Sequence, residues 1–367
     1  MVRWSWPAGA LALVGALACV LAGCGGAGGP VFEAAAPGEL QGVVLVGWDG
    51  AQRAHLQEMM ARDEVPNLVA LGAEGALVDI DITSGATDTK AGWTQILTGY
   101  TPETTGVWSN YVYTAIPEGY TIFERLKAHF GALGIYTGFI AGKKLNMDDQ
   151  GPGRETWALW AARQRFHGQD PGEPTPGRRV GIGTVVAEDG QLFVDYPPRP
   201  YYITATKVDL FVNGLMENRR VGERALRTIA DHRRERFLIF VHFAEPDETG
   251  HACGENSQEY TDAIHDDDVW LGRIIARLRE LGLYERTLVY VTSDHGFDEG
   301  GFNHRWAPYV FLATNDARVS RDGDRADVGP TVLKRFGVDV RALQPPLAGV
   351  PLDQPAPRVV APPEPPG

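Results

Sequence analysis

Six acidic and imidazole side chains follow three apolar, strand-like runs of this 367-residue chain. The six are Asp49, Asp247, His251, Asp294, His295 and His304. Carboxylate oxygens and imidazole nitrogens, with no cysteine among them, suit Zn²⁺ or Mn²⁺ better than a soft metal. Several carboxylates at one edge of a sheet would repel one another unless cations lay among them. The set therefore predicts a metal site, with enough ligands for two ions that could clamp a phosphoryl group.

Taken singly, these residues have plainer explanations. An aspartate after a strand commonly caps a helix or lies in a turn, and a histidine commonly makes one polar contact. Their joint occurrence at strand ends favours a metal site instead. Asp247 and His251 are four residues apart, so both can point the same way from a helical turn. Asp294 and His295 are adjacent, in a loop that can turn both inward.

A reacting group is also needed, and residues 84–110 are rich in hydroxyls. The candidates are Ser84, Thr87, Thr89, Thr94 and Thr98. A free hydroxyl is a weak nucleophile, and a metal ion that binds it as an alkoxide removes that difficulty. Threonine-rich stretches are also common as turns and caps, so spacing alone does not choose among these residues.

Strand-like runs alternate with helix-like runs along the chain. We expect strands at 42–51, 77–83, 133–143, 237–243, 287–293 and 308–314, and helices at 65–76, 121–130, 208–234 and 257–282. This alternation predicts an α/β fold with a mainly parallel central sheet sandwiched by helices. Ligands bind beyond the carboxyl ends of the strands in such sheets. Asp49, Asp247 and Asp294 all fall at such ends.

One domain is expected at 41–350, with an irregular cap insertion at 145–205, where turn residues dominate. The aromatic residues of this insertion could shape a substrate cleft or only cover the sheet. A net charge of −13 and a pI of about 5.2 argue against a nucleic-acid-binding surface. A small phosphate ester stays possible, because bound cations would dominate the local field.

The N-terminus predicts export. Residues 1–23 form a short apolar leader, and LAGC at 21–24 resembles a bacterial lipobox that would place a lipid anchor on Cys24. We expect a cell-envelope lipoprotein, sorted to the outer membrane, with a flexible tether at 24–40 and a Pro-rich tail at 351–367. The alternative is an ordinary cleaved signal peptide with a chance cysteine. Cys253 alone remains in the mature chain, so no disulfide is expected.

Five segments, VGWDG, ATDTKAGWTQILTG, TPETTGV, FAEPDETGH and TSDHGF, occur in this order. Their order and spacing resemble the alkaline phosphatase superfamily, in its type I phosphodiesterase / nucleotide pyrophosphatase and sulfatase-like branch. The resemblance covers most of residues 42–315. It implies that Thr89 is the nucleophile and that Asn110 holds a phosphoryl oxygen. It also implies two divalent ions, zinc or alternatively manganese, bound by Asp247, His251 and His304 and by Asp49, Thr89, Asp294 and His295.

The resemblance implies a phosphoric mono- or diester hydrolase that acts on a small molecule and forms a phospho-threonine at Thr89. TDTKAGW lacks the cysteine of the sulfatase motif C-x-P-x-R, which disfavours a formylglycine sulfatase. It also lacks the TFPNH of many diesterases, which leaves the substrate group open. A sulfuric ester or phosphonate hydrolase and an inactive surface-anchored binding protein are the alternatives. A phosphomutase is disfavoured by the export signal.

Three lysines are further candidates for contact with substrate. Lys90 adjoins the proposed nucleophile and could bind a phosphate oxygen or pair with Asp88. Lys143 and Lys144 follow a predicted strand. His242 and the run HDDD at 265–268 are expected to be structural.

Overall fold

The computed structural model describes residues 32, 35–36 and 39–355. The expected signal peptide at 1–23, the lipid site at Cys24, most of the 24–40 tether and the tail beyond 355 lie outside these residues. Those expectations therefore remain predictions. Among the described residues, no helix combines the length and the apolar character that a membrane crossing needs.

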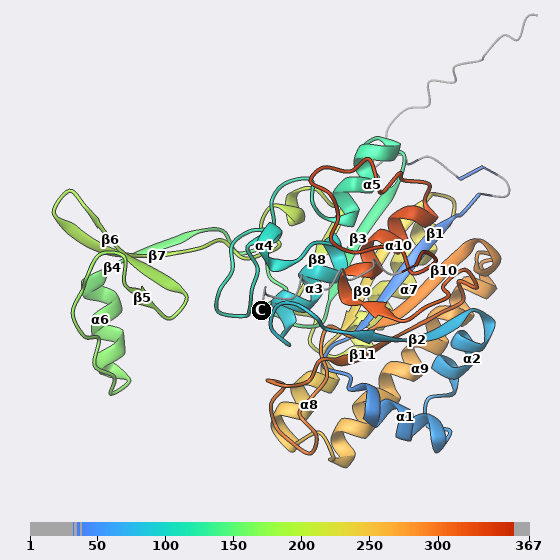
Figure 1. Cartoon of the computed structure of the whole chain (residues 1–367), viewed down its shortest axis with the longest axis horizontal. Helices are drawn as coiled ribbons and strands as arrows, with labels where there is room; N and C mark the ends of the chain where they lie inside the picture. Colours follow the sequence, from blue (N-terminus) through green and yellow to red (C-terminus); the bar gives the residue numbers. More distant parts are fainter. Residues whose placement is uncertain (1–31, 33–34, 37–38, 356–367) are drawn as a thin grey trace, which may run out of the picture. The chain divides into compact units, whose positions relative to one another are not determined.

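Eight strands form the central sheet (Figure 1). In spatial order they are β12 (Gly323–Asp324), β2 (Ala76–Asp81), β11 (Tyr309–Thr314), β10 (Thr287–Thr292), β1 (Gly42–Trp48), β9 (Phe237–Phe243), β3 (Tyr136–Ala141) and β8 (Leu210–Val212). Neighbours are parallel, except that β11 runs antiparallel to both β10 and β2. The predicted α/β fold with a mainly parallel sheet is confirmed.

Helices cover both faces of this sheet. One apolar cluster packs the sheet against α1 (Arg53–Ala61), α2 (Pro66–Glu74), α7 (Asn218–Asp231) and α9 (Gln258–Glu280). The other packs it against α3 (Thr89–Thr98), α5 (Ile122–Phe130) and α10 (Val328–Arg335). The remaining helical elements outside the 145–205 segment are α4 (Pro102–Thr105), α8 (Glu245–Cys253), η1 (Thr204–Thr206), η2 (Tyr284–Arg286) and η3 (Arg325–Asp327).

Strand β1 shows why the sheet is buried on both sides. Val44, Val46 and Trp48 belong to the first cluster, whereas Val43 and Leu45 belong to the second. Successive side chains of a strand point to opposite faces. A continuous apolar run therefore fits a strand that is covered by helices on both faces.

The 145–205 segment is more regular than its sequence indicated. It contains a four-stranded antiparallel sheet and one helix, namely β4 (Gly153–Thr156), α6 (Trp157–Phe166), β5 (Arg179–Val180), β6 (Gly183–Glu188) and β7 (Gln191–Tyr196). Trp160, Val185 and Val194 are buried in a separate small core. Strands this short, separated by Gly- and Pro-rich turns, leave little periodicity to detect.

Other boundaries also differ from expectation. The helix expected at 208–234 is the edge strand β8 followed by α7, because residues 210–212 pair with β3. Phe32, expected in the tether, is 7% exposed and packs against Tyr136 with ring centroids 5.4 Å apart. Leu352, expected in the tail, is fully buried, and its N–H donates to Oγ1 of Thr331 at 2.9 Å. The folded part therefore extends further at both ends than the sequence suggested.

Candidate active site

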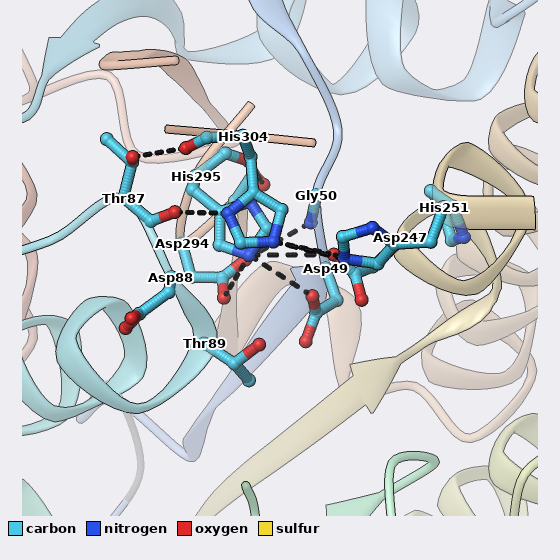
Figure 2. Close-up of polar contacts among 12 residues, drawn as sticks. Asp49, Gly50, Thr87, Asp88, Thr89, Asp247, His251, Asp294, His295 and His304 are labelled. Carbon is cyan, nitrogen blue, oxygen red and sulfur yellow. Dashed lines mark hydrogen bonds and ion pairs between the residues drawn. The ribbon is translucent and has the colours of Figure 1, made fainter. Parts of the chain in front are cut away.

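The carboxyl ends of neighbouring parallel strands bring the predicted residues together (Figure 2). Asp49 follows β1, Lys143 follows β3, and α8, which follows β9, carries Asp247 and His251. The loop between β10 and β11 carries Asp294, His295 and His304. Because β11 runs antiparallel to β10, this loop leaves the sheet and returns to it at the same edge.

Thr89 is the first residue of α3 and is almost fully buried. The side chain of Asp88 caps the helix, because its Oδ1 accepts a hydrogen bond from the N–H of Ala91 at 3.3 Å. Gly92 lets α3 approach the end of β10, since a Cβ at this position would lie 2.5 Å from Cβ of Asp294. The start of a helix favours negative charge. Thr89 is therefore placed where charge on its oxygen would be stabilised.

Each predicted histidine ligand has its Nδ1 beside a backbone carbonyl. The pairs are His251 with Phe302 at 2.8 Å, His295 with Gly296 at 2.9 Å, and His304 with Thr87. A ring that donates through Nδ1–H keeps its lone pair on Nε2, which is then free to bind a cation. The Nε2 atoms of His251 and His304 lie 3.1 Å apart, so the two rings face a common point.

The first ligand set implied by the resemblance comes together. Ligand atoms of Asp247, His251 and His304 lie within 4.8 Å of one another. Oδ1 of Asp247 is 3.5 Å from Nε2 of His251 and 3.8 Å from Nε2 of His304. His304, although it follows SDHG closely in sequence, therefore reaches the other two.

The second ligand set implied by the resemblance lies beside the first. Here the residues within 4.8 Å of one another are Asp49, Asp247 and His295. Nε2 of His295 lies 3.7 Å from Oδ1 of both Asp49 and Asp247, and 3.4 Å from Oδ2 of Asp294. Asp247 therefore borders both groups, in addition to belonging to the first ligand set that the resemblance implies.

Three buried atoms at this point have no hydrogen-bond partner among the described residues. They are Oδ1 of Asp247, Oδ2 of Asp294 and Nε2 of His295. An unsatisfied buried polar atom costs about 1–3 kcal/mol, so several of them together call for a common partner. Divalent cations would be such a partner, and carboxylates with imidazoles are suitable donors for zinc or manganese. The residues therefore fit the implied ions.

Lys143 is central among the candidate lysines. Its Nζ donates to Oγ1 of Thr89 at 3.0 Å. The same atom donates to Oδ1 of Asp49 at 3.1 Å and to Oδ2 of Asp247 at 2.5 Å. Burial alone would lower the pKa of Lys143, but the two aspartates raise the pKa above its ordinary value. The residue therefore supplies a fixed positive charge beside the predicted nucleophile.

Burial and neighbouring charges shift the pKa values of the clustered carboxylates and imidazoles in different directions. Burial alone would raise the pKa of Asp49, but Lys143 and a 2.7 Å hydrogen bond with His242 hold it below its usual range. Burial and repulsion from Asp49 raise the pKa of Asp294 well above its usual value. Burial lowers the pKa of His295. Burial, together with repulsion from His295, lowers the pKa of His304 to about 4. Both rings are therefore neutral, as a metal ligand must be.

Lys90 is the second residue of α3, and Asn110, from a later loop, contacts it. Oδ1 of Asn110 accepts from the N–H of Lys90 at 2.9 Å, and the N–H of Asn110 donates to Oδ2 of Asp88 at 2.7 Å. The Lys90 ammonium contacts the Asn110 carbonyl at 3.2 Å and the side chain of Asn146. Burial and then Arg199 lower the pKa of Lys90 to about 8. Lys90 is thus placed to hold Asn110 in position, rather than on the cleft wall or in an ion pair with Asp88.

Sequence reasoning missed two supports of the site. Arg325, fully buried, donates to the Asp294 carbonyl at 3.0 Å and to the carbonyls of Ser84 and Ala86 at 2.8 and 2.9 Å. Burial lowers its pKa to about 10. Its Nε also donates to Oε1 of Gln95 at 3.0 Å, but its other partners are backbone oxygens, which carry no sequence signal.

The second support is Glu255, which sequence reasoning did not single out. Its Oε1 lies 2.9 Å from Nδ1 of buried His55, and its Oε2 accepts from the N–H of Gly300 at 2.9 Å. The pair thereby restrains the glycine-rich loop that carries His304. The only signal in the sequence is that Glu255 follows the α8 motif closely.

Among the residues expected to be structural, His242 and Asp268 have clear contacts. His242 holds Asp49, as described above. Asp268, from the HDDD run, accepts from the N–H groups of Asn67 and Leu68 at 3.1 and 2.7 Å and so anchors the start of α2.

The site opens into a cleft of about 1020 Å³. Its polar wall includes Thr89, Asn110, Lys143 and Asp247, and Lys144 and Arg305 add positive charge. The chemistry thus lies in a space that admits a small organic molecule.

A family model described as type I phosphodiesterase / nucleotide pyrophosphatase matches residues 43–346. The chain belongs to this family. The matched residues include both ligand groups and Thr89, so the site described above lies within the part of the chain that the family model covers.

Solved structures agree on the fold. A protein of the alkaline phosphatase superfamily from Vibrio parahaemolyticus is similar with a TM-score of 0.52 and 16% identity, over 89% of this chain and 72% of that one. A protein solved with its substrate D-glucosamine-2-N,6-O-disulfate is similar with a TM-score of 0.50 and 12% identity, over 85% and 79%. The superfamily resemblance drawn from the five segments is confirmed.

Curated relatives match over shorter stretches. Steryl-sulfatase of Mus musculus is 38% identical over 86 residues, which are 21% of this chain and 13% of the relative. A 2,3-bisphosphoglycerate-independent phosphoglycerate mutase of Clostridium kluyveri is 28% identical over 113 residues, which are 28% of this chain and 21% of the relative. The matched part therefore spans about a fifth or less of these relatives.

Proposed function

We propose that this family member hydrolyses phosphoric mono- or diesters, with Thr89 as the nucleophile and two divalent ions, zinc or manganese, as cofactors. The observation that carries the proposal is the position of Oγ1 of Thr89. It lies 3.0 Å from the Lys143 ammonium and at the start of α3, beside the clustered carboxylates and imidazoles. Membership of a family described as phosphodiesterases and nucleotide pyrophosphatases supports ester hydrolysis.

The ions would be held by Asp49, Asp247, His251, Asp294, His295 and His304, with Thr89 itself. When bound, they would neutralise phosphoryl charge and make a hydroxyl or water a better nucleophile. The three unsatisfied buried atoms support this assignment.

The first chemical step takes place on Thr89. Its Oγ1 forms a bond to phosphorus as the bond to the leaving oxygen breaks, and the hydroxyl proton ends on the released alcohol. Lys143 donates to Oγ1 and so favours the negative charge that develops there. The start of α3 favours negative charge at this point through the helix dipole. Asn110, fixed by Lys90 and Asp88, is available to a phosphoryl oxygen. Water then cleaves the Oγ1–phosphorus bond and restores Thr89.

A panel of three esters tests this function on metal-loaded protein. p-Nitrophenyl phosphate, bis-p-nitrophenyl phosphate and p-nitrophenyl sulfate share one leaving group, so differences in rate report on the group transferred. We expect a phosphate ester to be preferred, with metal bound in the purified protein. A preference for the sulfate would replace the proposal with sulfuric ester hydrolysis, and bound metal without turnover of any ester would indicate a binding protein.

We also infer that the chain is exported and anchored through a lipid on Cys24. The support is the LAGC segment that ends a short apolar leader. Metabolic labelling with a radioactive fatty acid in a bacterial host should mark the wild-type chain and not Cys24→Ala. Equal labelling of both would reject the anchor.

A further inference from the structure

The cleft beside the site has an apolar wall that the chemistry described above does not use. It is formed by Ile82, Tyr111, Leu145, Met216, Trp306 and Pro308. Four of these side chains are unusually exposed for their type: Tyr111 at 71%, Leu145 at 63%, Met216 at 49% and Trp306 at 86%. Grouped exposed apolar side chains around a cleft mark a surface that a ligand covers.

Three residues of this apolar wall are close in sequence to polar residues of the cleft, and we call Asn110, Lys143 and His304 its polar floor. Leu145 lies two residues after Lys143, Tyr111 directly after Asn110, and Trp306 two residues after His304. A molecule whose phosphoryl group reached the floor would therefore place its organic group against these side chains.

Hydrogen bonds fix the backbone of the wall while the side chains stay exposed. Met216 donates its N–H to the Gly142 carbonyl at 2.8 Å, and Gly214 donates to the Lys143 carbonyl at 3.2 Å, so the segments that carry Leu145 and Met216 run side by side. On the other side, Asp298 accepts from the N–H groups of Arg305 and Trp306 at 3.1 and 2.7 Å. The wall is thus built into the fold.

Met216 also has a strained backbone. Its φ is +65°, and among the described residues the other non-glycine positions with positive φ are Asp63, Asn146 and Asp189. Asparagine and aspartate tolerate this region, whereas an unbranched apolar residue there is uncommon. Such strain is retained where the surrounding structure enforces it, often at ligand sites. Asn146, next to Leu145, has a φ of +74°.

Resting on the proposed function, we propose that the substrate is a phosphate ester with a bulky apolar organic group, such as an aryl group, that packs against Leu145, Met216 and Trp306. Lys143, Lys144 and Arg305, which line the same cleft, complement the anionic end. A small polar alcohol such as glycerol would leave the wall exposed and gain little from it.

Binding of non-hydrolysable anions separates this inference from catalysis. Phenylphosphonate and methylphosphonate carry the same anionic group on carbon and differ only in the organic group. Isothermal titration calorimetry of metal-loaded protein should show at least tenfold tighter binding of phenylphosphonate. The Leu145→Ala/Met216→Ala double variant should lose most of this preference. Leu159→Ala removes a leucine of similar exposure, 60%, that does not line the cleft, and should keep the preference.

The outcomes are distinct. Equal affinity for the two phosphonates, or a preference that the double variant retains, would overturn the inference even if esters are hydrolysed. A preference carried by Leu145 and Met216 without hydrolysis of any ester would support the apolar subsite and overturn the proposed function instead. The circular dichroism spectrum and metal content of the double variant distinguish loss of contact from loss of fold.

Discussion

The ammonium nitrogen of Lys143 lies 3.0 Å from Oγ1 of Thr89, although the two residues are 54 apart in sequence. Strand β3 is parallel to β9, and β9 is parallel to β1, so Lys143 follows its strand at the same edge as Asp49. Helix α3 begins at this edge, where Gly92 packs against Asp294. A charged donor already in place at the proposed nucleophile needs no reorganisation during the reaction. This contact gives the most direct test of the site.

Replacing Lys143 with methionine should lower kcat by about 10²–10³-fold, because a preorganised donor is lost from the reacting oxygen. Steady-state kinetics on the best ester would measure it. Lys207→Met provides a control, since Lys207 is half-exposed and pairs with Glu118 away from the cleft. Wild-type kcat in Lys143→Met would show that the ammonium is only structural.

Thr89→Ala should reduce turnover by about 10³-fold or more, because it removes the oxygen that is proposed to form the covalent bond to phosphorus. The variant should still fold, since the substitution removes only one small side chain at the start of a helix. Thr104→Ala, the same change in α4 and outside the cleft, should behave as wild type. Mass spectrometry of rapidly quenched wild type should show one phosphate on the peptide that contains Thr89. A phosphate found elsewhere would reassign the nucleophile.

Chelation should abolish activity, and zinc or manganese should restore it, since three buried ligand atoms lack hydrogen-bond partners in the part of the chain that the structure describes. His304→Gln should bind about one ion fewer than wild type by elemental analysis, because it removes one of three atoms that face one point. His167→Gln changes an exposed histidine in the insertion and should leave the stoichiometry intact. Activity that withstands exhaustive dialysis against a strong chelator would contradict the metal assignment.

Glu255→Gln should weaken ion binding by about tenfold, an effect typical of residues that orient a ligand indirectly. The change removes the charge that holds His55 and the N–H of Gly300, and so loosens the loop that carries His304. Competition with a zinc indicator measures this affinity directly. Glu259→Gln, on the exposed side of α9, is the matched control. Unchanged affinity in Glu255→Gln would mean that the loop is held by other contacts.

Arg325→Met should lower the free energy of unfolding by about 3 kcal/mol, because it leaves several buried carbonyl oxygens without a donor. Urea denaturation would measure the loss. Arg219→Met, at an exposed position of α7, should change stability by less than about 0.5 kcal/mol. Similar midpoints for the two variants would show that the buried guanidinium is dispensable.

The sequence was informative where backbone geometry follows from composition. Asp49 and Asp294 end long apolar runs, and parallel strands end at a common edge, so their convergence could be predicted. The choice of Lys143 over Lys144 could not, because the direction of a side chain in a turn depends on pairing with residues 214–216. The sequence also did not show that Asp247 borders both candidate groups, since the rotation of α8 decides what its carboxylate borders.

Other features left no readable pattern. Arg325 acts mainly through backbone oxygens, which every residue possesses, together with one side-chain oxygen of Gln95. The small sheet between 153 and 196 consists of short strands whose pairing is not local in sequence for β4 and β7. Its aromatic residues could be read from the sequence, but helix α6 and the arrangement of the strands could not.

The antiparallel direction of β11 has a consequence for how the ions would load. The loop between β10 and β11 carries Asp294 and His295 at its start and His304 near its end, so this one loop contributes to both ligand groups. The first ion to bind would restrict the motion of this loop and so lower the entropic cost of binding the second ion. Metal titration should therefore be positively cooperative, and one proteolytic cut in the glycine-rich stretch would disable both sites at once.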